Sequence, residues 1–319
     1  MNVNEDTIHI VSCVDRNYLQ HLGVLITSLF ENKTSLNNVT YHIIHNDLNE
    51  DDMVNLVQIE NKYHANIVFH NVGSMLCKYE GVVRYGHVSQ AGLYRLSIPQ
   101  ILPQLEKVLY FDSDIIINGD ITDLWSIDIS RYIVAAVEDA VPFTRHKALM
   151  MPINAKYFNS GVLYLNLHAW RSDNVTDKVL QFMIDYPERR VYNDQDGLNA
   201  VLYNKWLPLA PKYNQQSVLH YLPCKRLVYS KTECAEALKH PVIIHYTGVI
   251  KNSKPWHYID IHPLKKEYYK YLKLTPWKLY KTKAKNIHEI IKKFCLYLLR
   301  LKMRTGIVFG NVFKRKYKA

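Results

Sequence analysis

Short apolar runs alternate with helical patterns through the first 110 residues of the chain. The runs are rich in β-branched residues, and the intervals between them carry leucine and isoleucine at three- and four-residue steps, as in residues 19–29 and 53–59. This alternation predicts strands joined by crossover helices around a parallel sheet. The predicted strands are residues 8–14, 39–45, 67–70 and 108–111, followed by 133–137, 162–167 and 242–245.

No stretch rich in Gly, Ser or Pro and no internal repeat divides this pattern before about residue 260. We therefore expect one α/β domain over residues 1–260, followed by a separate segment over residues 261–319. In open α/β sheets, ligands bind at the carboxyl ends of the strands. Candidate residues are therefore those that directly follow the predicted strands, and neither a GxGxxG fingerprint nor a P-loop is among them.

Two carboxylates, Asp112 and Asp114, follow the apolar run that ends at Phe111. Their spacing directs both to one side of an extended chain, where hard oxygen ligands suit Mg²⁺ or Mn²⁺. His245 follows another strand, and an imidazole beside two carboxylates favours Mn²⁺ over Mg²⁺. Taken alone, a DxD pair also occurs in solvated loops, and a single histidine is more often structural.

Two further polar clusters have simpler interpretations. An acid at position 194 or 196 could cap the helix predicted over residues 197–203. Residues 158–161, which read FNSG, are most simply a turn before the strand at 162–167.

Charge divides the chain at Lys265. From there onward it holds 17 of the 40 basic and two of the 29 acidic residues, net +15, while the preceding part carries −4. The overall charge of +11 therefore describes neither part. No RNA- or DNA-binding motif accompanies the basic segment, and we expect no nucleic-acid partner.

Five cysteines form no CxxC pair and no zinc-ligand spacing. Their odd number suits a reducing compartment better than a disulfide framework, so we expect mostly buried thiols. The N-terminus has no features of a signal peptide, and no segment approaches the roughly 18 apolar residues of a spanning helix. These features predict a cytoplasmic location. The cysteines are Cys13, Cys77, Cys224, Cys234 and Cys295.

Apolar residues recur at helical spacing within the basic segment, from Ile287 to Leu301. The basic residues lie mostly on other faces, so the pattern predicts a basic amphipathic helix, which either docks on the body or binds an anionic membrane surface. We favour peripheral attachment to the inner face of the cytoplasmic membrane, because anionic lipid attracts each nearby basic residue by about 1 kcal/mol. The aromatics Tyr268, Tyr269, Tyr271, Trp277 and Tyr280 also suit an interface.

Seven motifs occur in order along the chain: DRNY from residue 15, YRL from 94, KVLYFDSD from 107, FNSGVLYLNLHAWR from 158, NDQDGLN from 193, HYTG from 245 and KPWH from 254. In this series the chain resembles glycosyltransferase family 8, retaining nucleotide-sugar transferases, and most of all its bacterial lipopolysaccharide galactosyl- and glucosyltransferases. The resemblance implies a GT-A fold, with a mixed, mostly parallel sheet flanked by helices, here followed by the basic helical tail.

The resemblance also implies how a UDP-sugar donor binds. Asp15 and Asn17 would hydrogen-bond the uracil and neighbouring groups, and Tyr18 would stack on the base. Arg95 would bind the donor sugar or the diphosphate side. The other implied donor contacts are Ser113, Gly248 and Lys254 near the ribose and phosphates, Asp139, Asn159, Ser160, Asp194 and Gln195 around the sugar, and Asp112, Asp114 and His245 on Mn²⁺. Lys251 is an alternative to Lys254 as the phosphate contact, because five residues separate Gly248 from Lys254.

The activity implied is metal-dependent transfer of galactose or glucose from UDP, in α linkage, to a glycan such as a lipopolysaccharide core. The residue expected opposite the anomeric carbon is Gln195, whose amide is a poor nucleophile. We therefore expect front-face attack, with Gln195 stabilising positive charge and Asp194 fixing the sugar hydroxyls. The alternatives are a DxD phosphatase and a non-catalytic nucleotide-sugar- or membrane-binding protein on the same fold.

Overall fold

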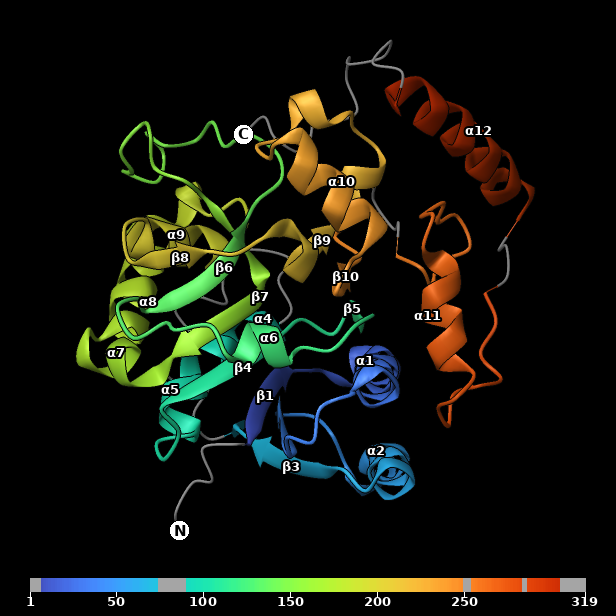
Figure 1. Ribbon diagram of the computed structural model, residues 1–319, viewed down its shortest axis with the longest axis horizontal. Coiled ribbons are helices and arrows are strands. Elements are labelled where there is room, and N and C mark those ends of the chain that lie inside the picture. The colour runs from blue at the N-terminus through green and yellow to red at the C-terminus, as the bar shows by residue number, and fades with distance from the viewer. Residues whose placement is uncertain (1–6, 74–89, 249–253, 283–285, 305–319) are drawn as a thin grey trace.

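The computed structural model describes residues 7–73, 90–248, 254–282 and 286–304 (Figure 1). A seven-stranded sheet lies at its centre, in the order β3-β2-β1-β4-β7-β6-β8. Its strands are β1 (Ile8–Cys13), β2 (Val39–His45), β3 (Asn66–Asn71), β4 (Lys107–Phe111), β6 (Val134–Glu138), β7 (Phe158–Asn166) and β8 (Trp206–Pro208). A second sheet of three strands has the order β5-β10-β9 and consists of β5 (Ile115–Ile117), β9 (Gln215–Gln216) and β10 (Ile243–His245).

The main sheet is mixed and mostly parallel, as predicted. β7 alone runs antiparallel to both its neighbours, β4 and β6. The parallel pairs β1–β2 and β2–β3 are joined by α1 (Leu19–Asn32) and α2 (Glu50–Tyr63), which are the two predicted crossover helices. All seven predicted strands are present, but the last of them, β10, belongs to the small sheet together with two strands that were not predicted.

Helices cover both faces of the main sheet. One apolar cluster packs α1, α2 and α6 (Thr122–Trp125) against one face, and a second packs the opposite face against a further set of helices. That set comprises α4 (Gln90–Tyr94), α5 (Ile98–Ile101), α7 (Leu167–Ser172), α8 (Val175–Asp185) and α9 (Asp194–Leu202). α10 (Lys231–Lys239) packs beside the small sheet (Figure 1). Because the sheet is buried on both faces, its polar residues lie mainly at the strand ends.

Residues 158–161 are the first part of β7, so their interpretation as a turn is wrong. Polar residues usually mark loops, but Asn159 and Ser160 are 8% and 6% exposed and are hydrogen-bonded inside the protein. The interpretation of Asp194 or Asp196 as the N-cap of the next predicted helix is wrong as well. Asn193 occupies the N-cap position of α9, with φ 51° and no side-chain capping bond.

Part of the basic segment belongs to the folded body. α11 (Lys265–Leu272) packs against α1, and Tyr268 and Tyr271 are buried there at 2% and 1% exposure. A methyl group on Gly23 of α1 would lie 2.4 Å from the Trp277 ring, so the indole is seated directly on the helix. The expectation that these aromatics face a membrane is therefore wrong for Tyr268 and Tyr271. Their side chains complete an apolar core.

The predicted amphipathic helix is α12 (Ile287–Arg304). It contacts the body through Leu296, through Arg300, which donates to Ile261 O at 3.0 Å, and through Lys293, which lies over the Tyr258 ring. Its apolar residues at the predicted spacing are instead exposed: Ile287, Ile290, Ile291, Phe294, Leu298 and Leu301. No helix within the described ranges is long and apolar enough to cross a membrane.

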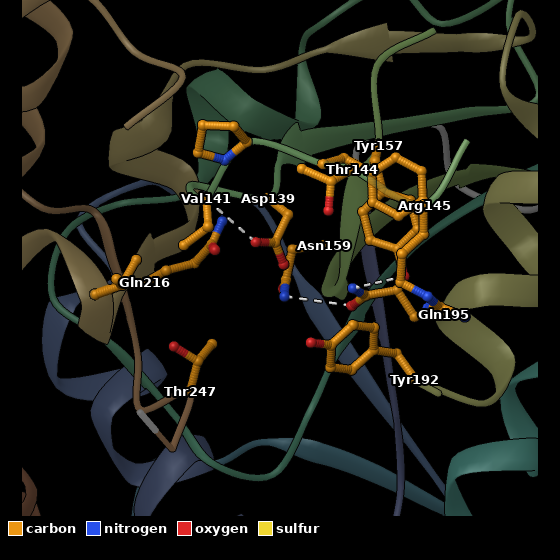
Figure 2. Close-up of a pocket in the computed structure, with 13 residues that line it drawn as sticks. Asp139, Val141, Thr144, Arg145, Tyr157, Asn159, Tyr192, Gln195, Gln216 and Thr247 are labelled. Atoms are coloured by element: carbon orange, nitrogen blue, oxygen red, sulfur yellow. Dashed lines mark hydrogen bonds between the residues drawn. The ribbon is translucent and has the colours of Figure 1, made fainter. Parts of the chain in front are cut away.

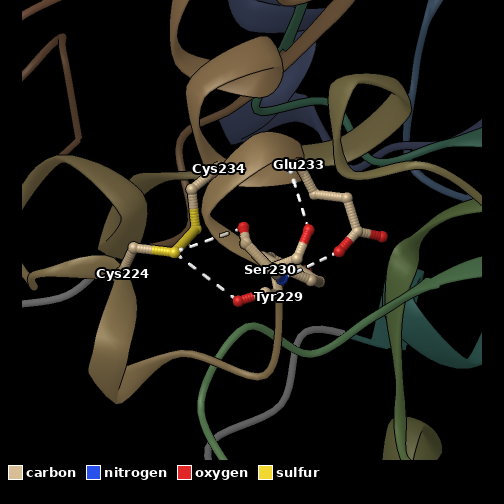
Figure 3. Close-up of a disulfide and its surroundings, with 5 residues drawn as sticks. All are labelled: Cys224, Tyr229, Ser230, Glu233 and Cys234. Atoms are coloured by element: carbon tan, nitrogen blue, oxygen red, sulfur yellow. Dashed lines mark hydrogen bonds between the residues drawn. A yellow bond between two sulfur atoms is a disulfide. The ribbon is translucent and has the colours of Figure 1, made fainter.

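The expectation of mostly buried thiols is wrong, because Cys224 and Cys234 form a disulfide (Figure 3). An odd cysteine count does not exclude one pair. Here the capping box between Ser230 and Glu233 starts α10 and places Cys234 in the first turn of the helix, facing Cys224. Cys13 is a buried thiol and Cys295 an exposed one, while Cys77 lies outside the described residues.

Candidate active site

Two cavities hold most of the predicted donor-binding residues. The first, about 240 Å³, brings together seven of the predicted residues, namely Asp15, Tyr18, Arg95, Asp112, Ser113, Asp114 and Asp194. The second, about 140 Å³, is lined by the predicted Asp139, Asn159 and Gln195 together with aromatic side chains (Figure 2). The sequence motifs are therefore assembled into two neighbouring sites, one beside the acids and one beside α9.

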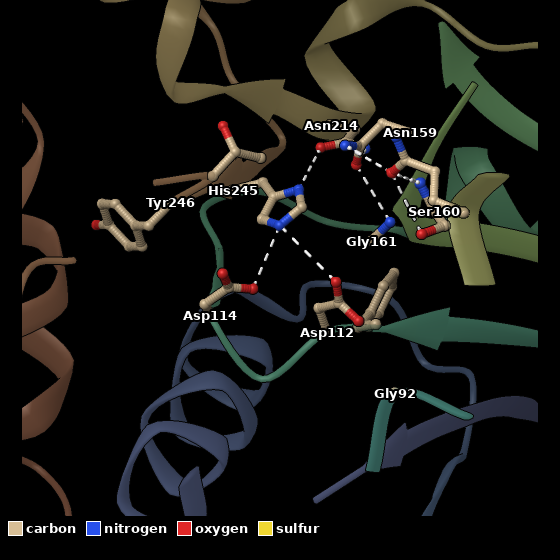
Figure 4. A network of polar contacts seen from close by, with 12 residues as sticks. Gly92, Asp112, Asp114, Asn159, Ser160, Gly161, Asn214, His245 and Tyr246 are labelled. Atoms are coloured by element: carbon tan, nitrogen blue, oxygen red, sulfur yellow. Dashed lines mark hydrogen bonds and ion pairs between the residues drawn. The ribbon is translucent and has the colours of Figure 1, made fainter. Parts of the chain in front are cut away.

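The predicted metal ligands lie where the two sheets meet (Figure 4). Apolar β4 is buried and ends at Phe111, so the acids that follow it emerge at the sheet edge. The antiparallel pairing of β5 with β10 then places His245 opposite Ile115, next to Asp114. Ligand atoms of Asp112, Asp114 and His245 all lie within 4.8 Å of one another. His245 Nε2 is 3.2 Å from Asp114 Oδ1 and 4.0 Å from Asp112 Oδ2.

Surrounding groups orient Asp112 toward this cluster. Its Oδ1 accepts hydrogen bonds from Tyr110 Oη at 2.6 Å and Arg95 Nη2 at 3.0 Å, so Oδ2 is the oxygen that faces His245. Arg95 is almost completely buried, and it also donates to Ser160 O at 2.6 Å. One cation therefore connects the acid of the first cavity to strand β7, which lines the second.

The cluster fits a divalent cation. Two carboxylates and one imidazole nitrogen form a mixed donor set that suits Mn²⁺ and also accepts Mg²⁺. β7 passes so close that a methyl group at Gly161 would lie 2.1 Å from His245 Cε1 and 2.9 Å from Asp112 Oδ2. Only glycine leaves this space open, so the backbone itself preserves the site.

Lys254 lies beside the same acids. Its Nζ donates to Tyr246 O at 2.6 Å and contacts Asp114. Burial works against both charges, but Asp114 raises the pKa of Lys254, and Lys254 together with His245 holds the pKa of Asp114 well below its usual range. Lys254 is thus a charged group beside the two acids, whereas the alternative Lys251 lies outside the described residues.

Gln195 is fixed at the boundary of the second cavity. Its Oε1 accepts from Ser160 N at 3.0 Å and from Asn159 Nδ2 at 3.3 Å, while its Nε2 donates to Tyr157 Oη at 3.1 Å. A backbone N–H can only donate, so the orientation of this amide is determined by Ser160. The side chain is therefore held in one position relative to β7.

Asp194, the neighbouring residue, is buried and its Oδ2 lies 3.0 Å from Arg95 Nε. Burial raises the pKa of Asp194 to about 6, although Arg95 opposes this shift. The preceding Asn193 has φ 51°, a backbone conformation that non-glycine residues seldom adopt and that is often found at functional sites. The strained residue directs Asp194 and Gln195 toward the two cavities.

Of the three residues predicted to contact uracil, Asp15 and Tyr18 line the first cavity and Asn17 does not. Asp15 Oδ1 accepts from Asn17 N and Tyr18 N and so caps a short helix, Arg16–Tyr18. Tyr18 is 37% exposed, lines the first cavity and makes an edge contact with Trp256 of the KPWH motif. The backbone N–H of Asn17 takes part in the cap, but its exposed side chain is not among the lining residues.

Sequence reasoning missed the groups that hold the site together. Asn214 accepts from His245 Nδ1 at 2.9 Å, and Arg145 forms a buried ion pair with Asp196 beneath Tyr157. None of them follows a predicted strand end. The one available signal was Asp196, which belongs to NDQDGLN but has no exposed surface, as expected of a structural acid.

Ionisation of Asp194 predicts a dependence of stability on pH. Because its pKa is higher in the folded protein than the ordinary 3.8, the folded state holds the proton more tightly, and stability falls as pH rises from about 4 to about 6. Asparagine cannot ionise. Relative to the unaltered protein, we therefore expect the free energy of unfolding of Asp194→Asn to rise by up to about 3 kcal/mol across this interval. Urea unfolding at about pH 4 and pH 7.5 measures the change, with exposed Asp177→Asn as control. An equal effect of Asp194→Asn at both pH values would contradict the assignment.

Comparison with known proteins agrees with this geometry. The family model "Glycosyl transferase family 8" matches residues 9–260. The chain is 34% identical to general stress protein A of Bacillus subtilis, over 86% of this chain and 96% of the relative, and 29% identical to a lipopolysaccharide 1,2-glucosyltransferase of Escherichia coli, over 99% and 93%. Its fold matches the crystal structure of galactosyltransferase LgtC with a TM-score of 0.72, at 20% identity, over 84% of this chain and 96% of LgtC.

These matches define the class of protein: a GT-A-type fold with a DxD site at the edge of its sheet. The chain belongs to glycosyltransferase family 8. It is therefore a glycosyltransferase, as the order of its motifs predicted, and the phosphatase alternative is wrong.

Proposed function

We propose that this protein is a retaining, metal-dependent hexosyltransferase that transfers galactose or glucose from UDP to a glycan acceptor in α linkage. The observation that carries the proposal is the cluster of Asp112, Asp114 and His245, whose two acids line the first cavity and which Arg95 and strand β7 connect to the cavity lined by Gln195. If the diphosphate of a UDP-sugar binds beside these residues, its base would lie toward Tyr18 and its sugar toward Gln195. One bound donor would then use the residues of both cavities.

Asp112, Asp114 and His245 would hold the cation, Mn²⁺ by preference. When bound, this cation neutralises charge that develops on the UDP leaving group. Lys254 adds a fixed positive charge beside the same acids, and Gly248 ends the HYTG segment that leads from His245 toward it. Arg95 holds Asp112 and Asp194 in place and, as a buried cation, supports negative charge at the diphosphate.

Gln195 and Asp194 would act on the bound sugar. The Gln195 carbonyl oxygen is a dipole held at the cavity wall, suited to stabilise an oxocarbenium-like centre while the acceptor attacks from the face that UDP leaves. Asp194, when ionised, accepts hydrogen bonds from sugar hydroxyls. Asp139, Asn159 and Ser160 complete the polar surface around the sugar.

A donor screen tests the proposal. Thermal unfolding with Mn²⁺ and each nucleotide sugar should show the largest rise in Tm with UDP-galactose or UDP-glucose, because a ligand at 100 times its Kd stabilises the folded state by about 2.7 kcal/mol. ADP-glucose and GDP-mannose are the matched controls for the base. Equal protection by all of them, or protection by none, would contradict a UDP-hexose site.

The acceptor proposed is a lipid-linked glycan such as a lipopolysaccharide core, with the enzyme at the inner face of the cytoplasmic membrane. This location rests on α12, whose basic side chains Lys293 and Arg300 contact the body while Phe294 and Leu301 are 65% and 64% exposed. An apolar helix face beside many basic residues suits an anionic lipid surface.

Replacing Ile290, Phe294 and Leu301 together by Ser should release the protein from phosphatidylglycerol vesicles. Each buried apolar side chain contributes about 1.5–3 kcal/mol, so the triple variant should lose well over tenfold in vesicle affinity. Sedimentation with vesicles measures binding, and Leu36→Ser with Ile153→Ser, both exposed and away from α12, is the matched control. Unchanged vesicle binding of the triple variant would reject the membrane role.

A further inference from the structure

A continuous row of hydrogen-bonded side chains leads from the metal cluster to Asn159 (Figure 4) and on to Gln195 (Figure 2). His245 Nδ1 lies 2.9 Å from Asn214 Oδ1, Asn214 Nδ2 lies 2.9 Å from Asn159 Oδ1, and Asn159 Nδ2 lies 3.3 Å from Gln195 Oε1. The row continues from Gln195 Nε2 to Tyr157 Oη (Figure 2), and Tyr157 Oη donates to Asp196. It therefore joins groups that the proposed function assigns to different tasks.

Backbone groups fix the direction of this row. Gly161 N–H donates to Asn159 Oδ1 at 3.1 Å, and Ser160 N–H donates to Gln195 Oε1 at 3.0 Å. Because a backbone N–H cannot accept, the oxygens of both amides must lie where the structure has them. At the far end the Asp196 carboxylate, paired with Arg145, accepts from Tyr157. Every donor in the row therefore points away from the metal cluster.

This direction determines the state of His245. With Asn159 Oδ1 fixed as an acceptor, Asn214 must turn its NH₂ toward it and its oxygen toward His245. Nδ1 must then carry a proton for Asn214, so Nε2 is the nitrogen that faces Asp112 and Asp114 and that can bind a cation held by them. A ligating histidine held in this way by its other nitrogen binds a metal more tightly.

We propose that Asn214 is a positioning residue that orients the His245 ring through Nδ1–H, with Nε2 toward the cation site, and couples the metal site to Gln195 in the sugar pocket. The proposal rests on the proposed function for the metal and the donor. Asn214 is fully buried and touches neither cavity, so it acts only through its two neighbours. Two variants separate its two hydrogen bonds.

Asn214→Leu removes both bonds, whereas Asn214→Asp retains the acceptor for His245 but places an oxygen against Asn159 Oδ1. The matched control is Gln215→Met at the next position, where a fully buried amide donates only to Ala237 O at 2.9 Å. Thermal unfolding of each variant checks that the fold is retained. A purely structural role would give Asn214→Leu and Gln215→Met the same effects.

Nitrogen-15 NMR of the metal-free protein detects the Nδ1–H group of His245 without donor or metal. We expect a hydrogen-bonded, slowly exchanging Nδ1–H in the unaltered protein, in Asn214→Asp and in Gln215→Met, and loss of this protected signal in Asn214→Leu. A retained, equally protected Nδ1–H signal in Asn214→Leu would overturn the first half of the proposal. This result is independent of whether the donor has been identified correctly.

Mn²⁺ affinity in the presence of UDP, measured by electron paramagnetic resonance, gives the second readout. Asn214→Leu should bind Mn²⁺ at least about tenfold more weakly, while Asn214→Asp and Gln215→Met stay close to the unaltered protein. Asn214→Asp should still lose at least about tenfold in kcat with UDP-hexose, because its link to Gln195 is broken. An Asn214→Asp variant with unchanged kcat, or equal Mn²⁺ loss in Gln215→Met, would overturn the coupling. Failure of the unaltered protein to bind Mn²⁺ and UDP would instead contradict the proposed function.

Discussion

Asp114→Asn should lower the turnover of UDP-hexose by on the order of 10³-fold, because a bound cation supplies several kcal/mol of charge stabilisation in the transition state. The substitution removes one ligand charge from the cluster with Asp112 and His245 and also the partner of Lys254. UDP affinity in the absence of metal should change far less than turnover. Release of UDP from UDP-glucose and UDP-galactose, with and without Mn²⁺, measures both effects.

The control for Asp114→Asn is Asp177→Asn, an exposed carboxylate in the first turn of α8. It changes the net charge equally but lies outside both cavities, so turnover should be unaffected. Turnover of Asp114→Asn within a few-fold of the unaltered enzyme would mean that the cluster does not hold the catalytic cation.

Gln195→Ala should leave UDP affinity nearly intact and lower kcat by about 10²–10³-fold, the usual effect of removing one preorganised dipole. The reason lies in its position: the Gln195 side chain is hydrogen-bonded to Ser160 and Tyr157, and it lines the second cavity but not the first. Steady-state kinetics and calorimetric UDP binding provide the comparison. Gln181→Ala, an exposed amide on α8 that donates to Asp185, is the control.

Loss of UDP or UDP-hexose affinity equal to the loss of kcat would argue against this role for Gln195. In that case the amide would bind the donor in its ground state and contribute nothing specific to the transition state.

The strand ends could be predicted because their chemistry is local. Asp112 and Asp114 follow a buried apolar strand, and His245 follows another, so hydrophobic patterning alone located all three. The family motifs then supplied Asp194 and Gln195. Both kinds of signal are short stretches of sequence whose meaning does not depend on distant residues.

Asn214 could not be predicted in this way. Its role comes from β9 pairing with β10, a contact between residues about 30 positions apart, within a sheet the pattern did not reveal. Asn159 and Ser160 were interpreted as a turn for a related reason, because polar residues in a buried strand are stable only when distant partners satisfy them. In the basic segment the error was the reverse: Tyr268 and Tyr271 were expected at a membrane surface, but they are buried in an apolar core formed with α1.

The central claim is that Asp112, Asp114 and His245 hold the cation of a UDP-hexose transferase. The most direct measurement is UDP release by the unaltered protein from UDP-galactose and UDP-glucose, with Mn²⁺ and again after chelation by EDTA. The account predicts slow release without an acceptor, faster release with a suitable glycan acceptor, and loss of both on chelation with recovery when Mn²⁺ is restored. Release that is unaffected by EDTA, or no release from either donor with any acceptor, would contradict it.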